Sequence, residues 1–381
     1  MLRSSTPLNS IPSGEVYRGL QAVRAIAAVM VVVEHTMLYV RERLDPSVVV
    51  WDGGRLGVYA FFVISGFVMQ LAVQQPRSPS WQMFAVRRVI RIVPLYWILT
   101  SVKVLVLALA PAVVLHAALS PRVVWLSYAF LPSRNIDGKV VPLLGVGWTL
   151  EMEMLFYALV TLALATRVNP MTLCALVTSV LTICHVVRGD SWPAWAFYGD
   201  PIVLFFLAGM ALAKWTADHD NRRLLLWFTW IIALWCFAWT LQAPDDAVSD
   251  FARIAKSIAV LVTMTLVVAA EPWLHRRVPR WLEFLGDATY AIYLSHPFIA
   301  PGIPVALGLL GLGGAGWIWA GYGAAVVVTF AVGVVLHVTV ERPITARLRR
   351  AVSRARDGGP DRNARPEVVD VRSGPAHDDA R

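Results

Sequence analysis

The chain is poor in charged residues. Only 15% of its 381 residues are Asp, Glu, Lys or Arg and 57% are hydrophobic, whereas a soluble domain carries about 25% charged residues. The mean hydropathy is +0.60, and segments such as 201–213 and 257–270 contain no charge. This composition excludes an ordinary soluble domain and predicts an integral membrane protein.

Cysteine is also scarce. The three residues Cys174, Cys184 and Cys236 lie in apolar segments without CxxC or other metal-ligand spacing. A disulfide framework and a cysteine-bound metal are therefore not expected. The net charge of +9 would suit a nucleic-acid binder. However, the arginines lie between apolar segments and in the tail, where they orient a membrane protein, so we expect a lipid bilayer and no nucleic acid as partner.

No signal-peptide cleavage site is present near the start. Arg18 and Arg24 precede the apolar segment AIAAVMVVV, as in a signal peptide, but no small-x-small site follows, and Glu34 and His35 interrupt the segment. An uncleaved first membrane span is the better interpretation.

Long apolar segments predict an all-α integral membrane protein, a bundle of about ten transmembrane helices. Pro297, Pro301 and Pro304 should kink or break the ninth segment, and no 20–50-residue repeat is visible. The predicted spans are 20–40, 56–74, 92–116, 147–166, 170–187, 201–214, 224–241, 253–270, 286–310 and 316–341.

Arginine placement predicts the orientation. With the N-terminus inside, the inner loops hold eleven Arg and Lys residues and the outer loops seven, which favours both termini in the cytoplasm (N-in/C-in) of a bacterial inner membrane. We therefore expect a cytoplasmic segment 1–18, a membrane domain 19–343 and a cytoplasmic tail 344–381. The tail is rich in charge, Gly and Pro, and its residues 351–381 should be disordered. The long outer loop 117–146 should cover part of the functional site.

Two ionisable residues share one face of the first span. Arg24 and His35 are eleven residues apart, so they lie about 20° apart around the helix and about 16 Å apart along it. Charges inside a membrane are costly and mark functional sites. The alternative is a snorkelling arginine and a histidine satisfied within the core. Glu34 points about 100° away from His35 and fits a structural partner.

The segment 57–70 reads GVYAFFVISGFVMQ, in which Gly57, Ser65 and Gly66 predict close helix packing rather than a serine nucleophile. In the segment that follows, Arg88 and Arg91 are i,i+3 and share a face at the cytoplasmic boundary. Their forked guanidinium groups suit the phosphates of a donor such as coenzyme A. The alternative is that both arginines only set the topology.

Acidic residues open the fourth span and a histidine lies in the ninth. Glu151 fits a solvated place at the interface, whereas Glu153 lies deeper. Counted from the span ends, His35 and Glu153 lie roughly 7.5 and 9 Å below the outer surface, which predicts a pair in which Glu153 orients the imidazole. His296 is the next candidate partner of His35. Glu341, at the end of the last span, fits a charged stop at the inner surface.

Together these segments resemble acyltransferase family 3, the multi-span membrane enzymes that O-acylate extracytoplasmic glycans, and most of all its members that acetylate bacterial exopolysaccharides. The resemblance covers most of residues 16–343. It rests on Arg24-x10-His35, FFVISGF (61–67), RRVIRIVPLYW (87–97), WTLEMEMLFY (148–157), GDATYAIYLSHP (286–297) and ERP (341–343).

The resemblance implies acetyl-CoA as acyl donor, no bound cofactor or metal, and an extracytoplasmic glycan or lipid-linked saccharide as acceptor. It makes His35 and Glu153 catalytic, with His35 as general base or transient acyl carrier. It matches Arg24 to the partner of that histidine and Arg88 and Arg91 to the paired arginines of the family. We assign Arg24, Arg88 and Arg91 to donor binding. We also assign Tyr293 and His296 to substrate binding. The competing interpretations are a transporter of a glycan or lipid-linked precursor, since intramembrane charges and a proline-interrupted span also occur there, and a non-catalytic partner in glycan assembly.

Two positions depart from the family pattern. Tyr59 stands where many members carry an acidic residue, and Met154 stands where many carry a second glutamate. Some relatives also carry a soluble transferase domain. Here only a short tail follows the spans, so we expect transfer to be completed in the membrane domain or with a partner.

Overall fold

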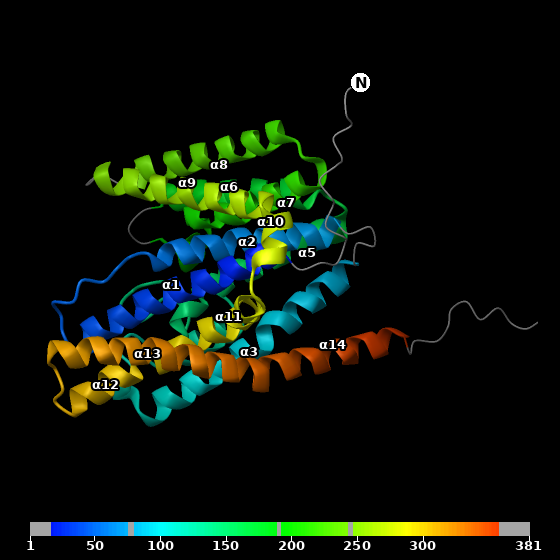
Figure 1. The fold of residues 1–381 in the computed structure, drawn as a ribbon. Coiled ribbons are helices and arrows are strands. Elements are labelled where there is room, and N and C mark those ends of the chain that lie inside the picture. Colours follow the sequence, from blue (N-terminus) through cyan, green and yellow to red (C-terminus); the bar gives the residue numbers. More distant parts are fainter. Residues whose placement is uncertain (1–16, 75–79, 189–191, 243–246, 358–381) are drawn as a thin grey trace, which may run out of the picture.

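The computed structural model describes residues 17–74, 80–188, 192–242 and 247–357, and these ranges are almost entirely helical (Figure 1). The longer helices are α1 (Arg18–Arg43), α2 (Gly54–Gln74), α3 (Trp81–Leu109), α5 (Trp148–Thr166), α6 (Pro170–Val186), α7 (Leu204–Asp218), α8 (Asn221–Gln242), α9 (Ala247–Ala269), α11 (Arg280–Ile299), α13 (Ala315–Leu336) and α14 (Arg342–Asp357). The shorter ones are α4 (Pro121–Tyr128), α10 (Glu271–Arg277), α12 (Gly302–Leu309), the 3-10 helices η1 (Pro111–Val113), η2 (Gly145–Gly147), η3 (Ala194–Gly199) and η4 (Pro201–Val203), and the π-helix η5 (His337–Glu341). An antiparallel bridge joins Arg134 and Val140.

Eight segments of the described chain are long and apolar enough to cross a membrane, so the chain is a multi-pass helical membrane protein. Each of the ten predicted spans falls on a helix. The two on α6 and α8 are not among the eight, and α6 has only 17 residues. A total of ten membrane crossings therefore stays a prediction.

Several predicted boundaries shift. The third span was predicted to begin at residue 92, but α3 begins at Trp81, where the Ser80 hydroxyl accepts a hydrogen bond from the Met83 N–H. The arginines after Trp81 are therefore part of the helix, not of a loop. The predicted break in the ninth span is confirmed, because α11 ends at Ile299 and α12 begins at Gly302, while Pro297 is accommodated inside α11.

The predicted disorder of the tail is wrong for its first part. Helix α14 continues to Asp357 and packs against α3. No Gly or Pro lies between Ile344 and Asp357, and Ala, Leu and Arg are good helix formers. The glycines and proline that lowered the helical expectation follow only after Asp357. The remainder of the predicted tail, residues 358–381, and residues 1–16 lie outside the described residues.

Close glycine contacts hold the centre of the bundle together. Helix α2 packs on α7, and a methyl group at Gly66 would collide with the Phe206 carbonyl, as one at Gly209 would with the Val63 carbonyl. A methyl group at Gly57 would likewise meet the Ala27 carbonyl of α1. The close packing predicted for Gly57 and Gly66 is thus confirmed. The three cysteines are free.

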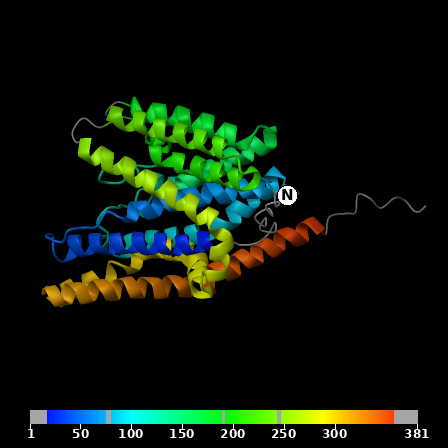
Figure 2. The same ribbon diagram turned by 45° about the horizontal axis from the view of Figure 1, so that its top comes forward.

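The long helices run in roughly one direction, so the bundle has two ends (Figures 1 and 2). The terminal end holds the start of α1 and the start of α14, and α14 projects beyond the other helices there. The distal end holds the connection between α1 and α2, residues 44–53. Each end contributes a different cavity.

Candidate active site

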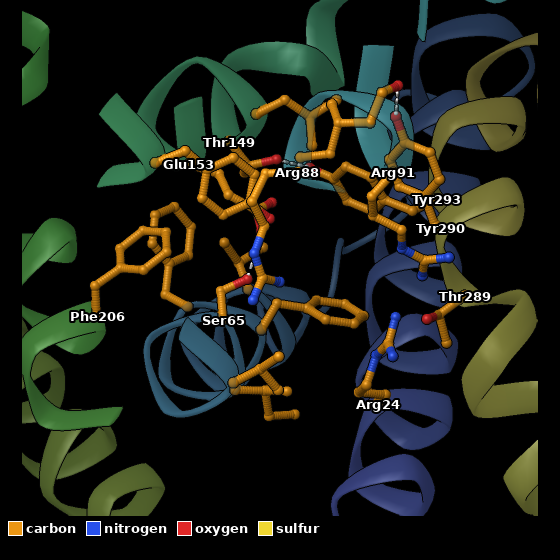
Figure 3. Close-up of a pocket in the computed structure, with 18 residues that line it drawn as sticks. Arg24, Ser65, Arg88, Arg91, Thr149, Glu153, Phe206, Thr289, Tyr290 and Tyr293 are labelled. Carbon is orange, nitrogen blue, oxygen red and sulfur yellow. Dashed lines mark hydrogen bonds between the residues drawn. The ribbon is translucent and has the colours of Figure 1, made fainter. Parts of the chain in front are cut away.

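A cavity of about 160 Å³ lies between α1, α2, α3, α5, α7 and α11. We call it the arginine cavity, because three arginines line it (Figure 3). Its polar lining residues are Arg24, Ser65, Arg88, Arg91, Thr149, Glu153, Tyr157, Thr289, Tyr290 and Tyr293. The arginines come from the parts of α1 and α3 nearest the terminal end. The structure therefore brings together all three residues predicted to bind the donor.

The three arginines differ in their partners. Arg91 Nη1 lies 2.8 Å from Glu341 Oε1, and the second carboxylate oxygen lies 2.7 Å from His337 Nδ1. Glu341 is only 3% exposed, so it is a buried partner of the site and not a charged stop at a surface. Arg88 pairs with no acidic side chain in the described chain and lies over the rings of Phe84 and Tyr157. Its guanidinium hydrogens are therefore available to an anion.

Among the described residues, the hydrogen-bond partner of Arg24 is a side-chain amide. Its Nη1 donates to Gln21 Oε1 over 3.2 Å. The cavity thus holds three arginines against one lining glutamate, Glu153, and the excess of positive charge favours an anionic ligand.

Glu153 is held by two hydroxyl groups and does not contact His35. Its Oε1 accepts hydrogen bonds from Ser65 over 2.7 Å and from Tyr157 over 2.5 Å. The predicted pair of Glu153 and His35 is therefore wrong. Depth in the membrane places a residue along the bundle axis but does not say which helices are neighbours, and Ser65 of α2 occupies the place beside Glu153.

A second cavity of about 350 Å³ lies nearer the distal end. We call it the histidine cavity, because His35 lines it. Its other polar and aromatic lining residues are Glu34, Arg55, Tyr59, Trp148, Asp200, Phe205, Trp235, Arg253 and Tyr293. Most belong to the distal ends of their helices, such as the start of α2 and the start of α5. Arg24 and His35 thus both face cavities, but not the same one.

Tyr293 separates the two cavities. Of all lining residues, only Tyr293 and Val58 are shared by both. The Tyr293 hydroxyl lies 3.0 Å from the Thr149 hydroxyl and 3.0 Å from the Val146 carbonyl. Val146 is the last residue of the loop 117–146, so this end of the loop contacts Tyr293, while its covering of the site stays a prediction. The two cavities therefore adjoin at Tyr293 and Val58.

His35 contacts His296. Nδ1 of His35 lies 2.7 Å from Nε2 of His296, and Nδ1 of His296 lies 2.6 Å from the Tyr293 carbonyl oxygen. A carbonyl oxygen only accepts, so His296 donates from Nδ1, and its Nε2 accepts from His35 in the neutral state. Nε2 of His35 is then the unprotonated nitrogen, which is the form a general base needs.

Sequence reasoning misjudged or missed several residues. Glu151, predicted to be solvated, is completely buried, and both of its carboxylate oxygens are without a partner in the described chain. Tyr157 and His337 were missed, although each is i,i+4 to its glutamate, a spacing that places two side chains on one helix face. Asp200 and Arg55 were missed because they lie at helix starts, where nothing in the sequence shows which cavity they line.

The chain matches the family model described as "Acyltransferase domain" over residues 17–338. It is 30% identical over 304 residues to the "Exopolysaccharide production protein ExoZ" of Rhizobium meliloti (strain 1021), an alignment that covers 78% of this chain and 91% of that protein. No solved structure matches the chain. The coverage confirms the resemblance found in the sequence: the chain belongs to acyltransferase family 3 and is a membrane acyltransferase.

Proposed function

We propose that the protein transfers an acetyl group from cytoplasmic acetyl-CoA to a sugar hydroxyl of an exopolysaccharide, or of another glycan, outside the bacterial inner membrane. One observation carries the proposal. An arginine-lined cavity and a cavity lined by a histidine base meet at Tyr293. The arginine-lined cavity suits an anionic donor, and the cavity with the histidine suits a neutral acceptor whose hydroxyl must lose a proton. The name of the relative from Rhizobium meliloti supports an exopolysaccharide as acceptor.

The donor binds in the arginine cavity. Arg24 and Arg88 offer guanidinium hydrogens to the phosphates of coenzyme A, and Arg88 has no competing carboxylate in the described chain. Arg91 contributes charge, although Glu341 already engages one of its nitrogens. With both termini inside, the terminal end of the bundle faces the cytoplasm, where acetyl-CoA is made. The thioester then extends from the arginines toward Tyr293.

His35 activates the acceptor. Its Nε2 takes the proton of the sugar hydroxyl as the oxygen attacks the thioester carbonyl carbon; the carbon–sulfur bond breaks, and the proton passes to the departing thiolate. If transfer proceeds in two steps, the same nitrogen carries the acetyl group between them. His296, which we predicted to bind substrate, acts instead as a positioning residue that fixes the His35 tautomer.

Glu153 acts on the donor side. It fixes the Ser65 and Tyr157 hydroxyls in the arginine cavity, where the donor lies. We therefore assign it to orienting groups around the donor rather than to raising the basicity of His35.

Two measurements test the function. Purified protein in lipid vesicles should transfer radiolabelled acetyl groups from acetyl-CoA to glycan prepared from host cells that lack the gene. Mass spectrometry of the glycan, with and without the gene, should show a mass difference of one acetyl group per modified site. His35→Gln, which keeps size and polarity but is no base, should abolish transfer while the protein still accumulates in the membrane. A wild-type protein that moves glycan across vesicles without acyl transfer would instead make it a transporter.

A further inference from the structure

We propose that the histidine cavity is the acceptor site and that it binds one neutral hexopyranose unit of the glycan. In this site Glu34 and Asp200 accept hydrogen bonds from the sugar hydroxyls and Trp148 packs against the sugar ring. The inference rests on the proposed function, since it names where the acceptor of that reaction binds. Its volume of about 350 Å³ lies at the lower end of the roughly 300–1,000 Å³ typical of ligand sites.

The two carboxylates are held in place by the protein. Glu34 Oε2 accepts from the Gly54 N–H at the start of α2 over 2.5 Å, and Asp200 Oδ1 accepts from the Ile202 N–H over 3.0 Å. A carboxylate has about four lone-pair positions, so each retains acceptor capacity after this bond. The bonds to backbone N–H groups at helix starts would by themselves explain where Glu34 and Asp200 lie. These bonds do not explain why both carboxylates line the same cavity as His35.

Aromatic side chains form the rest of the wall. Tyr59 stacks on Phe205 with ring centroids 4.3 Å apart, and the ring centroids of Phe205 and Trp235 are 4.4 Å apart. Trp148 is only partly buried and touches Phe62 and Phe197 with ring centroids about 6 Å away. A pyranose has an apolar C–H face and a rim of hydroxyls. An aromatic wall beside fixed carboxylates matches both features, because such pockets combine apolar area with a few placed polar groups.

The charge of the cavity favours a neutral ligand. Two carboxylates, Glu34 and Asp200, oppose two arginines, Arg55 and Arg253, around the lining. The arginine cavity has three arginines and one glutamate. A polyphosphate donor is therefore attracted to the arginine cavity and not to the histidine cavity. The difference in charge thus directs the donor and the sugar to different cavities, and their reacting groups come together near His35 and Tyr293.

Matched variants test the site. Glu34→Gln and Asp200→Asn keep the size and one acceptor oxygen but remove the charge, and Asn remains a good helix cap. Trp148→Ala removes the aromatic surface. Asp52→Asn is the control, because Asp52 is an exposed carboxylate at the same end that pairs with Lys256 over 2.6 Å and does not line the cavity.

The assay titrates glycan prepared from host cells lacking the gene, at saturating acetyl-CoA, and measures acetyl-CoA affinity separately by calorimetry. We expect the KM for glycan to rise about tenfold in Asp200→Asn, Glu34→Gln and Trp148→Ala, because charge-assisted hydrogen bonds and aromatic surface contribute on that scale. Acetyl-CoA affinity should stay at the wild-type value, and the Asp52→Asn control should match wild type in both measurements.

Two results would overturn the acceptor site. One is an unchanged KM for glycan in the variants that accumulate normally. The other is a loss of acetyl-CoA affinity in proportion to the loss of transfer, which would place the donor in this cavity. Failure of the proposed function itself looks different, since the wild-type protein would then neither bind acetyl-CoA nor acetylate the glycan. If one carboxylate variant fails to accumulate, the other carboxylate variant and Trp148→Ala decide, because Trp148 is only partly buried.

Discussion

His296 Nε2 lies 2.7 Å from His35 Nδ1, and this contact joins α11 to α1 beside the histidine cavity. The Tyr293 carbonyl lies 2.6 Å from the other nitrogen of His296. Because the carbonyl can only accept, it determines the proton order along both imidazoles and leaves the lone pair of His35 at Nε2. A backbone carbonyl and a second histidine thus fix the tautomer of His35, which is one of the two tasks of the carboxylate in a catalytic triad.

This relationship predicts different outcomes for two variants of His296. His296→Phe removes the acceptor for His35 Nδ1, so kcat should fall about 100-fold or more, the scale of a positioned general base. His296→Gln still offers a side-chain oxygen to His35 and should retain clearly more activity than His296→Phe. Acetyl-CoA affinity should be unchanged in both, because His296 does not line the arginine cavity.

A purely structural role of His296 would give another pattern. Both variants would then lower the melting temperature and the amount of protein in the membrane. The kcat per folded molecule would be no higher in His296→Gln than in His296→Phe. Equal, near-normal kcat values in the two variants would remove His296 from the mechanism.

Substitutions at Arg88 and at Arg91 should have different effects, one on donor affinity and the other on stability. Arg88→Lys keeps the charge but loses the fork, so the Kd for acetyl-CoA should rise about tenfold with no change in melting temperature. Arg91→Ala leaves Oε1 of the buried Glu341 without its 2.8 Å partner, while Oε2 keeps its contact with His337. A buried polar group without a partner costs about 1–3 kcal/mol, so the melting temperature should fall.

The matched control is Arg91→Ala combined with Glu341→Gln, which removes the unpaired charge and should recover part of the lost stability. If Arg88→Lys and Arg91→Lys both bind acetyl-CoA as wild type does, the two arginines serve only to orient the protein in the membrane.

The assignment of cavities to membrane sides depends on the orientation. Reporter fusions at Asp137, an exposed residue of the loop 117–146, and after the last residue should report outside and inside respectively. The excess of arginines in the loops and helix ends on the predicted inner side is the physical reason. The reverse pattern would put the arginine cavity on the outer side, and acetyl-CoA from the cytoplasm would then not reach Arg88 from the terminal end.

Much of the fold follows from local patterns. Hydropathy located every long apolar helix, because apolar length is a property of consecutive residues, whereas the polar helix α14 was missed. The i,i+3 spacing of Arg88 and Arg91 correctly placed both on one cavity, since helix geometry alone determines which residues share a face. The close approach of Gly57 and Gly66 to neighbouring backbones followed from residue size.

Contacts between distant helices did not follow in the same way. His35 and Glu153 have similar depths, but Glu153 bonds to Ser65 and Tyr157, while His35 bonds to His296. Sequence position gives the height of a residue along its helix, and only packing decides which helix stands beside it. The same limit explains why the burial of Glu151 could not be predicted, since its neighbours come from other parts of the chain.

Tyr293 should control passage between the two cavities. It lines both, and its hydroxyl lies 3.0 Å from the Thr149 hydroxyl and from the Val146 carbonyl. Tyr293→Phe keeps the ring but loses these bonds. It should lower kcat modestly, because the ring still separates the cavities while its position is less well fixed.

Tyr293→Ala should have a different effect, because it removes the partition. Water from the histidine cavity then reaches the thioester beside the His35 base, and exclusion of water is what protects a reactive acyl group from hydrolysis. We expect hydrolysis of acetyl-CoA without glycan to rise above the wild-type rate, while transfer to glycan falls. The ratio of acetate released to acetyl transferred, measured with radiolabelled acetyl-CoA, reports this change directly. Thr149→Val is the control, since it removes one hydroxyl contact of Tyr293 and leaves the ring in place. A Tyr293→Ala protein that loses hydrolysis and transfer equally would show that Tyr293 serves binding or folding and does not separate the cavities.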